Sequence, residues 1–140
     1  MRITVDSSAI IEIERRNEAV LRIFKKLVAE NHDLFISTIS VSEILTGVYL
    51  RKDVSQALFA AREILGQFQW VEVDGAVAEK TAQLLAYLIM EKKSVEYQDV
   101  VIASTALMQN SDALLTLNKK DFMVFPHLKG KVFAPTELRP

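Results

Sequence analysis

Short runs of β-branched and apolar residues alternate along the chain with longer stretches in which apolar positions repeat every three or four residues. The short runs predict strands over residues 2–5, 34–36, 70–73, 113–117 and 131–133. The longer stretches predict helices after residues 6–8 and over residues 19–30, 41–48, 57–65, 77–88 and 100–107. Strands that alternate with helices are typical of crossover connections between parallel strands.

Two segments indicate that the sheet is covered on both faces. Residues 100–107 are apolar almost all round, as in a buried helix, and residues 113–117 form a short apolar run bounded by polar residues, as in an interior strand. No linker rich in Pro, Gly or Ser and no internal repeat interrupts the chain. We therefore expect an α/β fold with a mostly parallel sheet, in a single domain over residues 1–140.

The composition excludes several kinds of binding site and reaction. The four glycines, at positions 47, 66, 75 and 130, allow neither a GxGxxG dinucleotide loop nor a P-loop, and the absence of cysteine excludes disulfides and thiol chemistry. No apolar run is long enough to span a membrane and the N-terminus does not resemble a signal peptide, so we expect a soluble, cytoplasmic protein. Because the net charge is −1, any nucleic acid must be met by a local basic patch.

Acidic residues stand where ligands usually bind such a sheet, beyond the carboxyl ends of strands and at the starts of helices. Asp6 directly follows the first predicted strand, although Asp before Ser-Ser is also a typical helix N-cap. Asp99 is in line with the apolar stripe that starts at Ile102, where a charge is costly unless it is paired or bound to metal. Asp121 follows the fourth predicted strand, and its alternative role is that of a solvated turn residue.

Glu43 is the acid for which the pattern favours a structural role. Residues 40–43 (Ser-Val-Ser-Glu) have the form of a capping box, in which a glutamate stabilises the start of a helix. Glu43 also lies opposite the apolar stripe of its helix, on a side with small residues that suits the wall of a cleft. Asn118 is either a turn former or a neutral oxygen ligand. Ser7 and Ser8 lack a nucleophile elbow and are expected to cap helices.

Four stretches, taken together and in order, resemble the PIN-domain nucleases, and especially the VapC-type toxins of toxin–antitoxin pairs. They are residues 5–10 (VDSSAI), 41–47 (VSEILTG), 99–107 (DVVIASTAL) and 115–122 (LTLNKKDF). The resemblance runs from residue 3 to about residue 126. It implies a three-layer α/β sandwich, cleavage of RNA with Mg²⁺ or Mn²⁺, a small antitoxin partner and a homodimer.

Residue by residue, the resemblance places Asp6, Glu43 and Asp99 on the three acids that bind the metal in this family. It assigns Asp121 as the fourth catalytic acid, although members of the family carry Asp or Asn at the position of Asn118, which leaves the fourth ligand open. We expect the RNA to contact neighbouring residues of the same segment: Thr116, Asn118, Lys119 and Lys120.

The residue types fit this chemistry on their own. Mg²⁺ and Mn²⁺ prefer carboxylate oxygen and keep bound waters, and a bound ion lowers the pKa of such a water. Attack by water leaves 5′-phosphate and 3′-hydroxyl ends. Two alternatives stay open: a PIN-like binding module without catalysis, and a receiver-like Mg²⁺-binding signalling domain. The latter requires paired acids after the first strand, where this chain has Asp6-Ser7-Ser8.

Overall fold

The computed structural model describes all residues from 1 to 140 and contains one central sheet of five strands. The strands are β1 (Arg2–Val5), β2 (Asp33–Ser37), β3 (Gln69–Val71), β4 (Ala113–Leu115) and β5 (Val132–Phe133), in the spatial order β3-β2-β1-β4-β5. Every pairing between neighbouring strands is parallel. The predicted α/β class and parallel sheet are therefore confirmed.

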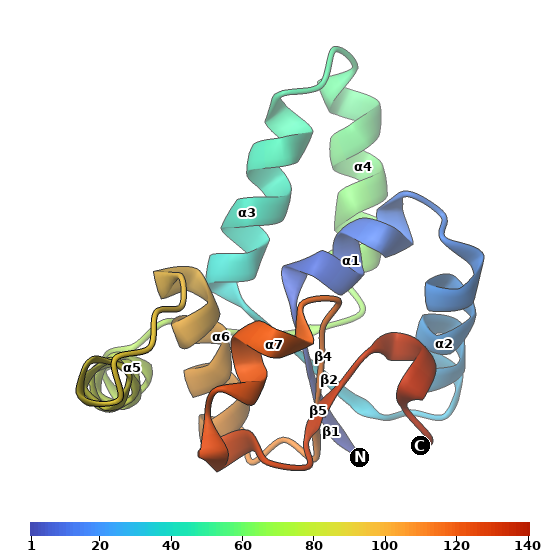
Figure 1. The fold of residues 1–140 in the computed structure, drawn as a ribbon. Helices are drawn as coiled ribbons and strands as arrows, with labels where there is room; N and C mark the ends of the chain where they lie inside the picture. The colour runs from blue at the N-terminus through green and yellow to red at the C-terminus, as the bar shows by residue number, and fades with distance from the viewer.

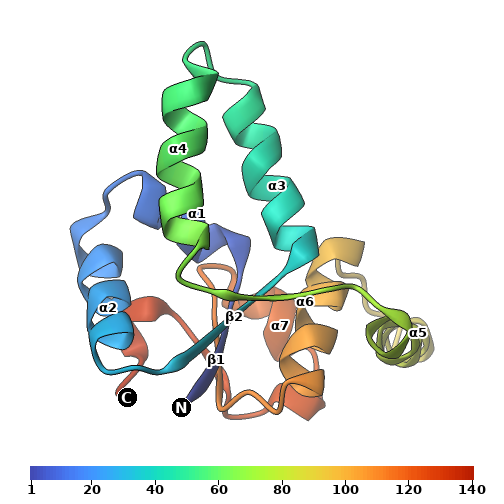
Figure 2. The same ribbon diagram turned by 180° about the vertical axis from the view of Figure 1, so that it is seen from behind.

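Helices cover both faces of this sheet. They are α1 (Ser7–Glu14), α2 (Glu18–Ala29), α3 (Thr38–Tyr49), α4 (Val54–Leu65), α5 (Gly75–Met90), α6 (Tyr97–Met108) and α7 (Lys119–Met123), with short 3₁₀ helices η1 (Pro126–Leu128) and η2 (Pro135–Glu137). Figure 1 shows α1 and α2 on one side, α5, α6 and α7 on the other, and α3 and α4 extending together beyond the sheet. Seen from behind in Figure 2, the chain after α4 runs along the sheet edge to α5. None of the helices has both the length and the apolar character needed to cross a membrane.

The alternation of side chains along β4 explains the layers. Ala113 and Leu115 belong to a buried apolar cluster that the sheet forms with α1, α2, α3 and α4. Leu114 belongs to a second cluster, formed with α5, α6, α7 and η1. Because successive side chains of a strand point to opposite faces, the sheet has an apolar core on each side. This arrangement is the three-layer sandwich that the resemblance implied.

Several segments differ from the pattern read in the sequence. The fourth strand, predicted over residues 113–117, is only Ala113–Leu115. Residues 119–123 form the short helix α7 where no helix was predicted, because five residues are too few to show a periodic apolar stripe. The third strand ends at Val71 rather than at residue 73. The chain leaves the sheet there because Asp74 caps α5, its Oδ1 accepting from the backbone N–H of Val77 at 2.9 Å.

The carboxyl ends of three adjacent strands form one edge of the sheet. Val5 of β1 is in register with Leu115 of β4, and the backbone N–H of Asp6 donates to the carbonyl oxygen of Leu115 at 2.9 Å. Asp6 and Thr116 are therefore neighbours, each directly beyond its strand. On the other side of β1, β2 ends at Ser37 and α3 follows at once. In an open parallel sheet this edge is where ligands bind.

Candidate active site

Asp6 is a buried carboxylate fixed by two hydroxyl groups. It is only 2% exposed, and its Oδ2 accepts hydrogen bonds from Ser8 Oγ and Thr116 Oγ1, each at 2.8 Å. Asp6 occupies the N-cap position of α1 in its backbone, but its side chain makes no capping hydrogen bond. The carboxylate is thus held by side chains rather than used to stabilise the helix start.

Backbone N–H groups fix the direction in which the hydroxyls of Ser8 and Thr116 donate their protons. Ser8 Oγ accepts from the N–H of Leu117 at 3.0 Å, and Thr116 Oγ1 accepts from the N–H of Asn118 at 2.9 Å. A hydroxyl that accepts in this way keeps its single proton for donation elsewhere. Ser8 therefore orients Asp6, and the expectation that it caps a helix is wrong.

The true start of α3 removes the structural role predicted for Glu43. Ser37 is the N-cap, with its Oγ accepting from the N–H of Ile39 at 3.2 Å, because β2 ends there and the helix begins at Thr38. The capping box predicted for residues 40–43 is therefore wrong. Ser40 lies inside the helix, completely buried, and its Oγ has no hydrogen-bond partner. Glu43 is exposed, and its Oε1 lies 3.4 Å from Ser7 Oγ, which is also 3.4 Å from Asp6 Oδ1.

Asp99 lies in the first turn of α6, where the sequence placed it on an apolar face. Ile102 and Ala103, three and four residues further on, are completely buried, so the stripe exists as predicted. Asp99 itself is only half-buried, because it stands at the end of the stripe where the helix begins. Its carboxylate is therefore partly withdrawn from water without being enclosed.

Burial and mutual repulsion raise the pKa values of two of these acids. The pKa of Asp99 rises to about 7, first because burial disfavours its charge and then because of the carboxylates of Asp6, Asp121, Glu43 and Glu96. No hydrogen bond is among the causes. The pKa of Glu43 is also raised, first because the cleft partly withdraws its carboxylate from water although the side chain as a whole is exposed, and then by Asp6, while the hydrogen bond from the Ser7 hydroxyl opposes the rise. The acids are therefore close enough to act on one another.

These acids share one polar cleft of about 380 Å³ at the carboxyl edge of the sheet. A single lining residue is hydrophobic; the full lining is Asp6, Ser7, Glu43, Ser94, Val95, Glu96, Asp99, Asn118 and Asp121. Sequence reasoning missed Glu96, which is exposed at the N-cap of α6. A signal was available, since an acid three residues before Asp99 falls on the same side of a helix.

The family model of the PIN domain matches residues 3–128. The chain belongs to the PIN domain family. The match covers the same part of the chain as the four stretches that carried the resemblance, and this confirms the resemblance. The comparison with curated proteins gave no match.

Solved structures similar to this PIN domain cover nearly its whole length. VapBC2 from Rickettsia felis, bound to a DNA fragment from its promoter, is 21% identical with a TM-score of 0.85, covering 96% of this chain and 98% of that chain. DNA-bound VapBC from Salmonella typhimurium is 19% identical with a TM-score of 0.83, covering 96% and 98%. FitAcB from Neisseria gonorrhoeae is 28% identical with a TM-score of 0.78, covering 97% and 99%. The PIN domain therefore shares its fold with proteins of the VapBC type.

The residues expected to contact RNA occupy different positions around the cleft of the PIN domain. Asn118 is exposed and lines the cleft together with Asp121. Thr116 is completely buried and donates to Asp6, which places it behind that acid and out of reach of a substrate. Lys120 is exposed and forms no ion pair with another residue of the domain.

Lys119 is already engaged in an ion pair. Its Nζ lies 2.9 Å from Oε1 and 3.1 Å from Oε2 of Glu137. The pKa of Glu137 is lowered, first by the hydrogen bond from the backbone N–H of Ala134 and then by Lys119. The ion pair fastens α7 to η2, and a phosphate would have to compete with Glu137 for this lysine.

The donor atoms of the cleft fit a hard divalent cation. Carboxylate oxygens dominate the lining, and the chain has no thiol to favour a softer metal. As the side chains lie, however, no three of the acids surround a common point closely enough to hold an ion. Bare carboxylates repel one another, which keeps an exposed side chain such as Glu43 away from its neighbours. Asp6 is the acid whose position is already fixed.

Proposed function

We propose that this PIN domain is a metal-dependent endoribonuclease that hydrolyses RNA phosphodiesters with water, and that it is the toxin of a toxin–antitoxin pair. The observation that carries the proposal is the convergence of carboxylates from four separate segments on one polar cleft: Asp6, Glu43, Glu96 with Asp99, and Asp121. Structural acids are rarely gathered in this way, because the gathering costs stability. Membership of the PIN domain family supports the same activity.

Asp6, Glu43 and Asp99 would hold the cation, with either Asn118 or Asp121 as the fourth oxygen ligand. Mg²⁺ or Mn²⁺, when bound, lowers the pKa of a water and neutralises charge on the phosphate. Asp6 supplies a ligand of fixed position, because the Ser8 and Thr116 hydroxyls hold it. The exposed amide of Asn118 offers both a donor and an acceptor to the ribose–phosphate backbone.

The hydrogen bonds of the cleft favour water over a side chain as the nucleophile. The Ser8 oxygen accepts from the N–H of Leu117 while its proton holds Asp6, and Ser7 Oγ reaches the carboxylates of Asp6 and Glu43 only at 3.4 Å, so neither hydroxyl is well placed to be activated by a base. Attack by water predicts products with 5′-phosphate and 3′-hydroxyl ends. The ribose 2′-hydroxyl takes no part in this chemistry, so preference for RNA must come from binding.

Cleavage of a mixed RNA pool tests the activity. The wild-type protein should cut in the presence of Mg²⁺ or Mn²⁺ and not with a chelator, and the product ends should carry 5′-phosphate. Asp99→Asn should abolish cleavage while the circular-dichroism spectrum is kept, since it removes ligand charge at constant volume. Glu72→Gln, at an exposed carboxylate outside the cleft, is the matched control. Metal-independent cleavage, or cleavage by Asp99→Asn at the wild-type rate, would overturn the proposal.

The proposed partner is a small antitoxin that presents arginine or lysine to the acidic cleft, with the toxin itself a homodimer. A guanidinium group pairs with carboxylates in a bidentate fork and can occupy the place of a cation. The likeness to FitAcB and to VapBC complexes supports this assignment. Inhibition should weaken as salt or Mn²⁺ rises, and light scattering should give twice the 15.8 kDa chain mass. An inhibitor that binds the Asp6→Asn/Asp99→Asn variant as well as the wild type would place the partner elsewhere.

A further inference from the structure

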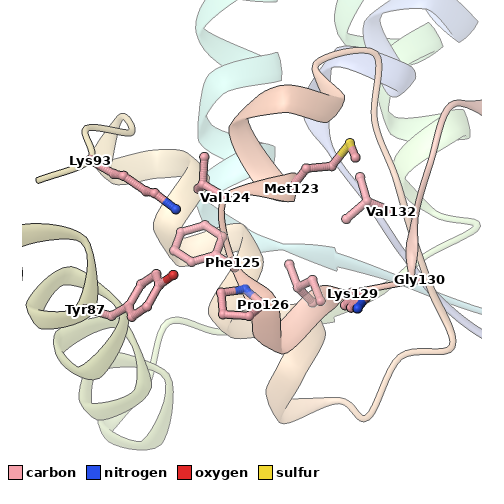
Figure 3. Close-up of a pocket in the computed structure, with 10 residues that line it drawn as sticks. Tyr87, Lys93, Met123, Val124, Phe125, Pro126, Lys129, Gly130 and Val132 are labelled. Carbon is pink, nitrogen blue, oxygen red and sulfur yellow. The ribbon is translucent and has the colours of Figure 1, made fainter. Parts of the chain in front are cut away.

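A second cavity, of about 460 Å³, lies between α5 and the segment that follows α7. Figure 3 shows Tyr87 and Lys93 on one side of it, Phe125 and Pro126 in the middle, and Lys129 beyond Pro126 on the other side. The walls are largely apolar, and the charged residues among them are both lysines. No acid lines the cavity, in contrast to the cleft of the acids.

The two cavities adjoin along two stretches of chain. Lys93 lines the second cavity, and the next residue, Ser94, lines the acidic cleft. On the other side, Asp121 lines the cleft and Met123, at the end of α7, lines the second cavity. Lys93 and Ser94 are consecutive, with Cα atoms about 3.8 Å apart, and Asp121 and Met123 are two residues apart, so the linings of the two cavities adjoin. The two cavities are therefore close enough for one bound strand to contact both.

Tyr87 is an aromatic residue of the cavity wall, and its ring contacts both His127 and Lys93. The ring of Tyr87 is half-buried and packs edge-on against the ring of His127, with centroids 5.7 Å apart and planes at 90°. Lys93 Nζ lies above the Tyr87 ring, 5.9 Å from its centroid. This distance is at the outer limit of a cation–π contact, so the exposed ammonium group can move to a phosphate at little cost. Bases bind to single-strand sites by stacking on aromatic rings beside such cations.

We propose that this cavity is a nucleotide subsite, in which a base of the RNA close to the cleaved phosphodiester packs against Tyr87 while Lys93 and Lys129 contact the adjoining phosphates. The proposal rests on the proposed nuclease function and deepens it. The volume is within the range of pockets that take up small organic ligands, about 300–1,000 Å³. The subsite also supplies the basic surface that a chain of net charge −1 needs beside its acids. Lys119 is less available to an RNA phosphate, because it already forms an ion pair with Glu137.

Fluorescence anisotropy of a short, labelled, single-stranded RNA of mixed sequence tests the subsite, with Ca²⁺ in place of Mg²⁺ to slow cleavage. The variant Lys93→Ala/Lys129→Ala should bind about tenfold more weakly at physiological salt, and the slope of log affinity against log salt should fall by about 1.4, or about 0.7 for each phosphate contact. The matched control is Lys25→Ala/Lys26→Ala, which makes the same charge change on exposed positions of α2, on the far side of the molecule in Figure 1.

Tyr87 separates stacking from charge. Tyr87→Leu should weaken binding about fivefold or more without changing the salt slope, whereas Tyr87→Phe should retain wild-type affinity because it keeps the ring. Thermal melts of each variant identify any loss of folding, and the lysine variants, on exposed side chains, test the subsite independently of it. If the wild type cleaves RNA but the lysine variants bind with the wild-type affinity and slope, the subsite is refuted and the nuclease stands. If the wild type neither binds nor cleaves RNA, both are refuted.

Discussion

Asp99→Asn should make the metal-free protein more stable at a pH above about 7, although it removes a residue that we assign to catalysis. The pKa of Asp99 rises from its usual 3.8 to about 7, so the folded state resists ionisation of this carboxyl group while the unfolded state does not. Between these two values the folded chain binds more protons, and stability falls as the pH rises. Asparagine has the same shape and no charge, so it removes this cost.

The size of the effect follows from the shift in pKa. At 1.36 kcal/mol for each pKa unit, a rise from 3.8 to about 7 corresponds to at most about 4 kcal/mol. Asp99 is only half-buried, and screening by water and salt reduces this figure to about 1–2 kcal/mol. For a domain of 140 residues this is a rise in melting temperature of about 3–8 °C.

Thermal or urea unfolding in the presence of a chelator measures the effect. The difference between Asp99→Asn and the wild type should be near zero at about pH 3, where Asp99 is protonated in both the folded and the unfolded state, and should reach its full value at about pH 8. Glu72→Gln, at an exposed carboxylate outside the cleft, should show no such pH-dependent gain. If Asp99→Asn is no more stable than the wild type at about pH 8, the repulsion inferred among the acids is absent and the reasoning fails.

The remaining predictions concern the same cleft. Asp6→Asn and Glu43→Gln should each abolish metal-dependent RNA cleavage. Glu43→Gln should leave the melting temperature unchanged or higher. A loss of about 1 kcal/mol of folding stability in Glu43→Gln would instead mean that Glu43 does stabilise the start of its helix. Thr116→Val should lower stability by about 1–2 kcal/mol and also the cleavage rate, because Asp6 loses a donor, and Thr116→Ser should retain both. Lys119→Ala/Lys120→Ala should weaken RNA binding in a salt titration without changing metal affinity; unchanged salt dependence would exclude this segment from the RNA path. Calorimetric affinity for Mn²⁺ should rise as the pH passes through about 7, because ligands must lose their protons; equal affinity on both sides would contradict the raised pKa.

The sequence was sufficient for the parallel sheet because its evidence is local. Each strand is a short apolar run between polar residues, and the helices have enough turns to show a stripe. Asp6 and Asp99 were identified for the same reason, since one directly follows a strand and the other lies on an apolar stripe. The helix α7 was missed because its five residues contain a single buried side chain, Phe122.

What the sequence could not supply depends on contacts between distant residues. The hydroxyl of Thr116 reaches Asp6 across 110 positions of the chain, and nothing near either residue indicates that they meet. The capping box at residues 40–43 was misread because two candidate caps compete for one helix. Ser37 prevails because the pairing of β2 with β3 fixes where that strand ends, and with it where α3 begins.

The cleft combines one acid of fixed position with others that only a cation can bring together. Asp6 is held by two hydroxyl protons, whereas Glu43 has one long contact with Ser7 and Asp99 is opposed by four neighbouring carboxylates. A cation would therefore bind first at a formed ligand and then draw in the rest, which replaces repulsion with attraction. The free energy stored in this repulsion lowers the stability of the metal-free chain. The same free energy favours binding of whatever neutralises the acids, either a divalent cation with its RNA or the basic side chain of an inhibitor. If both neutralise the same carboxylates, as we propose, the metal and the antitoxin should compete, and binding of either to the cleft should weaken binding of the other.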